Sequence, residues 1–176
     1  MTQLLVLGLL KKEALSGYDI QLKLQTSSSE LWGDILVGSI YYALNKLERD
    51  GYIKVSILKQ IGRRQKSIYS ITDKGEKYLD ELILNSLKTA DICYSTTLYS
   101  ALSFFELLPK EDYIPALEKH KKSLEENFET LHKQKVEKEK LFQGNMPPLN
   151  NLIFENMFNT LKEQISFVEK VLEVLK

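Results

Sequence analysis

Glycine and proline are segregated along this chain of 176 residues, and that segregation limits the folds it can adopt. Seven of the eight glycines lie within the first 75 residues, whereas all four prolines lie at position 109 or later. Glycine marks tight turns, and proline marks helix starts and breaks. We therefore expect two small domains: residues 1–88, built from short elements, and residues 89–176, built from longer helices.

The composition is that of an ordinary globular protein, with 43% hydrophobic and 27% charged residues. No apolar run approaches the ~18 residues of a membrane span. Lysines follow the short run from Leu4 to Leu10, an order that is wrong for a secretory signal. A single cysteine, Cys93, excludes an intrachain disulfide and is expected to be structural. These features predict a cytoplasmic protein that carries no metal or cofactor and has no contact with a membrane.

The segment GSIYYALNKLERDGYI, which starts at Gly38, predicts a helix with two contrasting faces. Ile40, Leu44 and Leu47 recur at i, i+4 and i+7 and form an apolar face. Ser39 is expected to cap this helix and Gly51 to end it. The opposite face carries Tyr42, Asn45, Lys46 and Arg49, with Tyr41 at its flank. An aromatic ring, an amide and two cations supply the donors that binding in a DNA major groove requires.

Short helices are expected before this one, at about 4–10 and 17–25, with Ser16 as the cap of the second. Two strands are expected after it. In the first, Ile53, Val55 and Ile57 alternate with polar residues, and in the second, Tyr69 and Ile71 alternate with Ile68 and Ser70. The loop between the strands, 60–65, carries a glycine and two arginines. Asp73 is expected to cap a further helix, with Glu76 at the capping-box spacing. The order of elements predicts a mainly α fold with a small β-hairpin, a winged helix-turn-helix.

The hairpin is also the most basic part of the chain. Lys54, Lys59, Arg63, Arg64 and Lys66 fall within 13 residues that contain no carboxylate, although the whole chain has 24 basic and 24 acidic side chains. Such a stretch is typical either of a nucleic-acid footprint or of a solvated loop, and charge alone does not separate them. In a winged helix, Arg63, Arg64 and Lys66 would grip the DNA backbone or the minor groove.

Three segments together resemble the PadR family of transcriptional regulators. They are SGYDI from Ser16, LWGDILVGSIYYALNKLERDGYI from Leu31, and GRRQKSIYSITDKG from Gly62, and the resemblance covers roughly residues 1–85. It implies a ligand-responsive repressor that binds an inverted-repeat operator as a homodimer and is not an enzyme. It also implies that Tyr41 contacts a DNA phosphate. The alternative is a winged-helix module for small-molecule binding or protein interaction that does not bind DNA.

The second half predicts a pair of long helices. The run from Lys110 to Lys140 balances lysines with acids, as a solvated helix does, and Pro115 fits only in its first turn. The last helix carries an apolar seam at a/d-like spacing that ends at Leu175. This pattern fits either an intrachain hairpin or a hairpin that also packs on a second subunit, and the family resemblance implies the latter. The residues predicted for dimerisation are Leu117, Leu124, Phe128, Phe154, Phe158, Leu161, Ile165, Val168 and Leu172.

The resemblance further implies a small aromatic or hydrophobic effector that binds between the two domains. The candidate residues are Tyr18, Trp32, Tyr94 and Tyr99. For Trp32, a place in the core that anchors the loop before the third helix is the competing interpretation.

Overall fold

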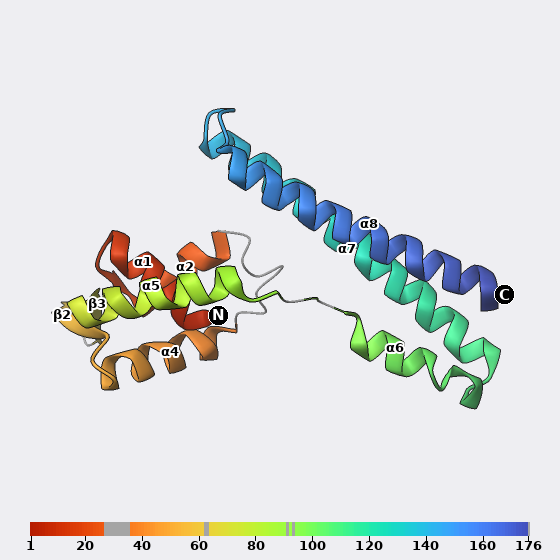
Figure 1. Cartoon of the computed structure of the whole chain (residues 1–176), viewed down its shortest axis with the longest axis horizontal. Coiled ribbons are helices and arrows are strands. Elements are labelled where there is room, and N and C mark those ends of the chain that lie inside the picture. Colours follow the sequence, from red (N-terminus) through yellow and green to blue (C-terminus); the bar gives the residue numbers. More distant parts are fainter. Residues whose placement is uncertain (27–35, 62–63, 91, 93, 176) are drawn as a thin grey trace. The chain divides into compact units, whose positions relative to one another are not determined.

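The computed structural model describes residues 1–26, 36–61, 64–90, 92 and 94–175. The chain divides into two compact units, Met1–Ile92 and Cys93–Lys176, and each has an apolar core of its own (Figure 1). Trp32, Arg63 and Cys93 lie outside the described residues. Among the helices that are described, none is both long enough and apolar enough to cross a bilayer.

The first unit is a winged helix-turn-helix. Its elements are α1 (Thr2–Lys12), β1 (Leu15–Ser16), α2 (Gly17–Thr26), α4 (Val37–Arg49), β2 (Ile53–Ile61), β3 (Arg64–Ile71) and α5 (Asp73–Lys88). The core gathers Leu7 from α1, Ile20 from α2, Leu44 and Leu47 from α4, and Ile53 from β2, each at most 2% exposed. This confirms the predicted fold, mainly α with a small β-hairpin.

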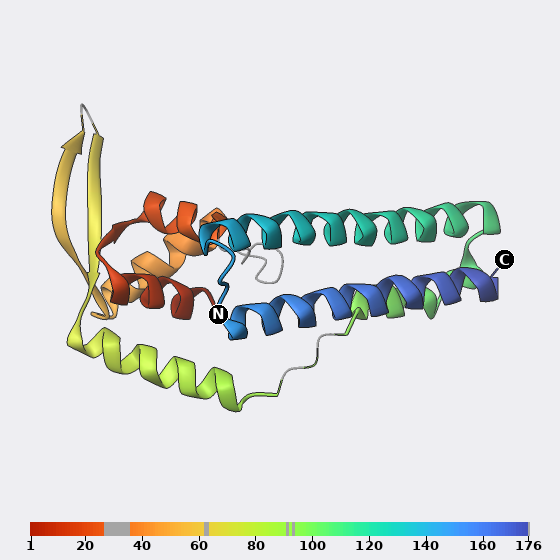
Figure 2. The same cartoon turned by 90° about the horizontal axis from the view of Figure 1, so that it is seen from above.

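The sheet has one more strand than the sequence predicted. Its order is β1-β3-β2 and every pairing is antiparallel. The extra strand pairs Leu15 with Tyr69 and Ser16 with Ile68. A two-residue strand is too short to show an alternating pattern, so periodicity could not reveal it. Figure 2 shows the β2–β3 hairpin as a long ribbon that extends past the helices of its own unit.

The end of α4 follows the predicted stop at Gly51. Gly51 has φ 77°, the left-handed region that glycine adopts without steric cost. Its N–H donates to the Glu48 carbonyl at 2.9 Å, and the N–H of Tyr52 donates to the Leu47 carbonyl at 2.8 Å. These two bonds form a Schellman motif, which satisfies carbonyls at the end of the helix. The chain therefore turns sharply from α4 into β2.

The start of α4 differs from the prediction. The helix begins at Val37, and its N-cap residue Leu36 has no side-chain capping bond. Ser39 lies inside the first turn, where its hydroxyl donates to the Leu36 carbonyl at 2.6 Å. The prediction that Ser39 caps this helix was wrong by one turn.

The alternation predicted for β2 holds only at its start. Ile53 pairs with Ile71 and is 2% exposed. The register then shifts between Val55 and Ile57, and Ser56 donates its hydroxyl to the Ile68 carbonyl at 3.0 Å. Such a bulge changes the phase of the side chains along a strand. Ile57 is consequently 48% exposed, and the prediction that it faces the core was wrong.

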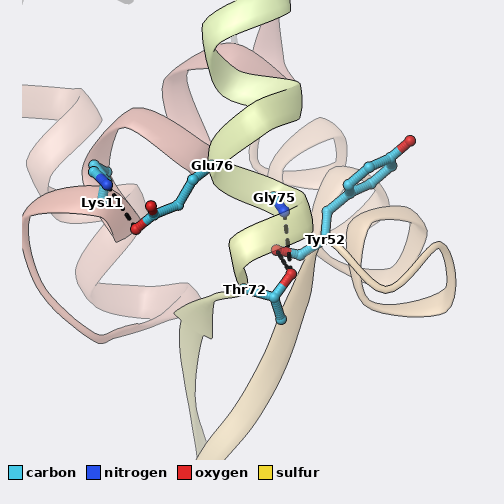
Figure 3. Close-up of polar contacts among 5 residues, drawn as sticks. All are labelled: Lys11, Tyr52, Thr72, Gly75 and Glu76. Atoms are coloured by element: carbon cyan, nitrogen blue, oxygen red, sulfur yellow. Dashed lines mark hydrogen bonds and ion pairs between the residues drawn. The ribbon is translucent and has the colours of Figure 1, made fainter.

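The start of α5 is held against the end of α4. Thr72, rather than the predicted Asp73, is the N-cap residue, and its hydroxyl oxygen accepts the N–H of Gly75 at 3.1 Å (Figure 3). The same hydroxyl lies 3.0 Å from the Tyr52 carbonyl, to which it donates. A Cβ at Gly75 would collide with that carbonyl. The close approach at Tyr52 therefore requires glycine at position 75.

Two contacts join α5 to α1. Glu76, predicted as the acid of a capping box, instead lies 2.6 Å from Lys11 Nζ (Figure 3). Two residues further along α5, the Tyr78 hydroxyl donates to Gln3 Oε1 at 3.1 Å. These contacts place α5 beside α1 and help to close the core of the unit.

The second unit is a helical hairpin with a short helix at its open end. It contains α6 (Thr96–Leu102), the 3₁₀ helix η1 (Phe105–Leu107), α7 (Lys110–Leu141) and α8 (Pro148–Leu175). Both views show α7 and α8 side by side (Figures 1 and 2). The two long helices were predicted, but Pro115 lies in the second turn of α7 rather than the first, because Pro109 is the N-cap residue and the helix begins at Lys110.

The predicted apolar seam packs within the hairpin. Val168 and Leu172 of α8 pack with Leu117 of α7, and the rings of Phe128 and Phe158 lie 5.0 Å apart. Of the nine residues predicted for dimerisation, Leu117, Phe154, Val168 and Leu172 are buried and Leu124, Phe128, Phe158, Leu161 and Ile165 are half-buried. Packing within one chain thus accounts for much of their burial, and their contact with a second subunit stays a prediction.

Candidate nucleic-acid interface

Two sharply different faces define α4. Ile40, Ala43, Leu44 and Leu47 are all at most 2% exposed and pack into the core. The other face presents Tyr42 at 70% exposure, together with exposed Asn45 and Arg49. The core contact fixes the rotation of the helix about its axis, because turning it would bring apolar residues into water. The polar face is therefore held outward as a preformed surface.

The cations of this face are weakly paired within the chain. Lys46 is half-buried and forms no ion pair with another described residue. The Arg49 side chain is 74% exposed and lies 3.5 Å from the carboxylate of its neighbour Asp50. A surface pair at that distance contributes little to stability. Both cations thus remain available for an external anion.

Tyr41 and Ser39 occupy the flank of this surface. Tyr41 is 44% exposed. Burial raises the pKa of Tyr69 on β3, and the neighbouring Glu48 and Tyr41 of α4 raise it further. Ser39 is half-buried, and its hydroxyl hydrogen already bonds the Leu36 carbonyl. A contact from Ser39 to a phosphate would have to break that bond.

The backbone register of the hairpin is described up to its tip. Position 59 pairs with position 66, and Ile61 pairs with Arg64 at the last described rung. The sequence predicted a loop over 60–65, whereas the strands extend to Ile61 and resume at Arg64. Arg63 lies outside the described residues.

The residues predicted to bind an effector belong to different units. Tyr18 is 62% exposed on α2 in the first unit. Tyr94 and Tyr99 belong to the second unit, with ring centroids 6.5 Å apart, and Tyr99 packs edge-on against Phe167 at 5.7 Å. Trp32 lies outside the described residues. The structure thus joins two of these four predicted residues.

The second unit contains an apolar pocket that the sequence did not indicate. It has a volume of about 500 Å³ and lies between α6, η1 and the start of α7. Its walls include Leu98, Leu102, Phe105, Tyr113 and Leu117. Their spacing on α6 and α7 looked like ordinary helix packing, so no sequence signal distinguished a pocket from a filled core. Across the described parts of both units, no group of three or more His, Cys, Asp or Glu is placed to hold a metal ion.

Comparisons with known proteins place this geometry among transcriptional regulators. Residues 6–81 match the model of the "Transcriptional regulator PadR-like family". Over 79 residues the chain is 33% identical to the negative transcriptional regulator PadR of Bacillus subtilis (strain 168). That sequence match covers 45% of this chain and 43% of the relative, so it spans less than half of the curated protein.

Solved structures match over nearly the whole chain, including the long helices of the second unit. The structure of smu.1604c from Streptococcus mutans UA159 has a TM-score of 0.78 and 27% identity, and covers 97% of this chain and 98% of that one. Bacillus subtilis PadR in complex with operator DNA has a TM-score of 0.73 at 22% identity, covering 99% and 97%. The same protein in complex with p-coumaric acid has a TM-score of 0.70 at 21% identity, covering 98% and 97%. At 22% and 21% identity, these two matches show that the chain and Bacillus subtilis PadR have the same fold.

Proposed function

We propose that this chain is a PadR-like transcriptional regulator that binds operator DNA in a sequence-specific way and represses transcription. The observation that carries the proposal is the outward face of α4. Tyr42, Asn45 and Arg49 are exposed on this face, while the opposite, apolar face is buried and holds the helix in place. A helix of this kind fits a major groove, and its amide and cations can bond base edges and phosphates. A DNA-binding regulator of this type acts in the cytoplasm.

The hairpin supports the proposal as a second point of contact. Its sequence carries five cations and no carboxylate between Lys54 and Lys66. Phosphates of the DNA backbone would be bound by Arg63, Arg64 and Lys66. In this arrangement α4 reads bases while the hairpin supplies affinity that is independent of sequence.

The competing function is a winged-helix module that binds proteins or small molecules but not DNA. Such a module would be expected to carry acidic or apolar residues where this chain has Lys46, Arg49, Arg63 and Arg64. Its cationic face makes DNA the better fit, because phosphate contacts depend on exposed cations.

Selection of genomic fragments by the purified protein tests the proposed function. We expect recovery of an enriched inverted repeat, bound more tightly than random DNA. As a control, Asn45→Ala removes an amide from the α4 face while leaving the core intact, and should weaken the selected site more than random DNA. Recovery of no enriched sequence would reject sequence-specific regulation.

We also propose that the protein acts as a homodimer, assembled through the second unit. Large apolar side chains remain exposed there, with Phe104 at 66%, Leu107 at 81%, Leu152 at 61% and Val174 at 84%. Apolar side chains left in water favour association with a partner. A two-fold dimer would present two α4 helices to successive major grooves, about 34 Å apart, and so match an inverted repeat.

A small aromatic or hydrophobic effector is proposed for the apolar pocket of the second unit. Its 500 Å³ volume falls within the usual range of ligand sites, and its walls are mostly apolar. p-Coumaric acid, with which the Bacillus subtilis relative was solved, is a suitable probe. Calorimetry should detect binding to the wild type, and Ala101→Trp, which adds bulk to a lining position, should abolish it. Unchanged binding by this variant would place the effector elsewhere.

A further inference from the structure

Gly17, the first residue of α2, lies against a side chain of the proposed DNA surface. A Cβ built on Gly17 would be 2.8 Å from Tyr41 Cε1 and 3.4 Å from Tyr41 Cζ. It would also be 3.2 Å from Leu44 Cδ1. Real Cβ atoms do not approach carbon at the shortest of these distances, so a side chain at position 17 would displace the Tyr41 ring.

The backbone at Gly17 is held from the preceding residue. Ser16 is 3% exposed and pairs with Ile68 in the sheet. Its hydroxyl donates to the Asp19 carboxylate at 2.6 Å, and its own N–H donates to the same oxygen at 3.2 Å. These bonds fix the start of α2, so this segment cannot easily move to accommodate a larger residue.

The backbone conformation does not explain why position 17 is glycine. The residue is helical, and Gly51 and Gly144 are the glycines with positive φ among the described residues. Glycine within a helix is less favourable than alanine. The absence of a side chain at position 17 is therefore explained by the space that the Tyr41 ring occupies.

We infer that Gly17 is a positioning residue for DNA binding: by leaving room for the inner edge of the Tyr41 ring, it directs the phenol hydroxyl of Tyr41 toward a phosphate. The inference rests on the proposed function, because it extends the DNA surface of α4 to a residue on α2. Tyr41 is 44% exposed, and its ring atoms Cε1 and Cζ lie nearest to a Cβ built at position 17. With alanine at position 17, the ring must rotate away and the hydroxyl leaves its position.

The test is a double-mutant cycle between Gly17→Ala and Tyr41→Ala in the full chain, titrated with a short random-sequence DNA duplex. Random DNA is suitable because phosphate contacts do not depend on sequence. We expect Gly17→Ala to weaken binding about tenfold, as for the loss of one hydrogen bond to a charged group. With Tyr41→Ala already present, Gly17→Ala should have no further effect.

The matched control is Gly8→Ala, which makes the same substitution in α1, where a Cβ would meet no atom within 4 Å. It should leave the affinity for DNA unchanged. Circular dichroism establishes that each variant is folded. If Gly17→Ala fails to fold, the double variant should recover the fold because the obstructing ring is gone, and a double variant that stays unfolded rejects the inference.

The remaining outcomes separate this inference from the proposed function. A folded Gly17→Ala variant with wild-type affinity rejects the positioning role while DNA binding stands. Equal weakening by Gly17→Ala with and without Tyr41 also rejects it, since the effect then does not pass through the ring. If the wild type does not bind the duplex, both the proposed function and the positioning role are rejected.

Discussion

The helices α4 and α8 both carry a periodic apolar face, but they differ in what the rest of the helix does. From Ile40 to Leu47, the aliphatic residues of α4 are at most 2% exposed, and the one other aliphatic side chain of the helix, Val37 at its start, is 43% exposed. On α8, the seam is buried or half-buried against α7, yet Leu149, Leu152 and Val174 remain more than 60% exposed. Beyond its first residue, α4 buries its apolar face within the chain, whereas α8 leaves several large apolar side chains exposed.

The pairing of charged side chains also differs between the two units: lysines form ion pairs on α7 and α8, whereas Lys46 of α4 does not pair with a described residue. On α7 and α8, lysines form ion pairs with carboxylates. Lys121 Nζ lies 2.7 Å from Glu169 Oε1, and the hydrogen bond to Glu169 raises the pKa of Lys121. Lys135 pairs with Glu139 along α7. On α4, Lys46 has no such partner among the described residues. This contrast supports the proposals that the first unit binds a polyanion and that the second unit associates through apolar surface.

The largest effect is expected where burial is complete. Leu47→Ala removes a fully buried side chain from α4 and should lower the free energy of unfolding of the first unit by about 2–5 kcal/mol. Leu152→Ala, the same change at a 61% exposed position of α8, should alter the free energy of unfolding of the second unit by no more than about 0.5 kcal/mol. Urea denaturation measures both. Equal losses would mean that Leu152 is covered in solution.

Removal of the second unit tests whether its leftover apolar surface joins two chains. A chain that ends after Lys88, the last residue of α5, should stay folded on the core of the first unit and be monomeric by light scattering. Its affinity for a selected inverted repeat should fall at least about 100-fold, because the two half-sites are no longer bound together. A truncated chain that remains a dimer would overturn the comparison drawn above.

The fold was largely predictable because its signals are local. The face of α4 and the turn at Gly51 follow from residues within a few positions of each other. The bulge at Ser56 and strand β1 were not predicted, because both depend on pairing with β3, which sequence spacing does not encode. The capping error at Asp73 has a similar cause, since Thr72 bonds the Tyr52 carbonyl from a distant part of the chain. The error at Ser39 is local, because its hydroxyl bonds the Leu36 carbonyl within the first turn.

The candidate site was predictable only on α4 itself. Tyr42, Asn45 and Arg49 lie on the exposed face that the helical period indicated. Gly17 was missed, although SGYDI was noted as a motif, because its contribution is space for a ring that lies 24 positions away in the sequence. The burial of Val168 was predicted, but helical period shows only that a residue is covered and not which chain covers it.

Removing the two arginines near the tip of the β2–β3 hairpin tests whether this hairpin contacts DNA phosphates. Arg63→Ala with Arg64→Ala should weaken selected and random DNA alike and reduce the slope of log affinity against log salt by up to about 2. The matched control is Lys135→Ala, which removes a cation that is paired on α7 and should leave the slope unchanged. An unchanged slope in the double variant would remove the hairpin from the DNA surface.

The smallest effect concerns Tyr69, where β3 meets the α4 surface. Burial, and then Glu48, raise its pKa above 10.0, the ordinary value of a tyrosine. Because the folded protein favours the neutral phenol, Tyr69 contributes stability that is fully present below that ordinary value and is lost as the pH rises through the raised pKa. Tyr69→Phe should therefore lessen the fall of the melting temperature at alkaline pH, whereas Tyr42→Phe, at an exposed position of α4, should not. Parallel alkaline profiles for the wild type and Tyr69→Phe would show that this phenol does not link the hairpin's stability to pH.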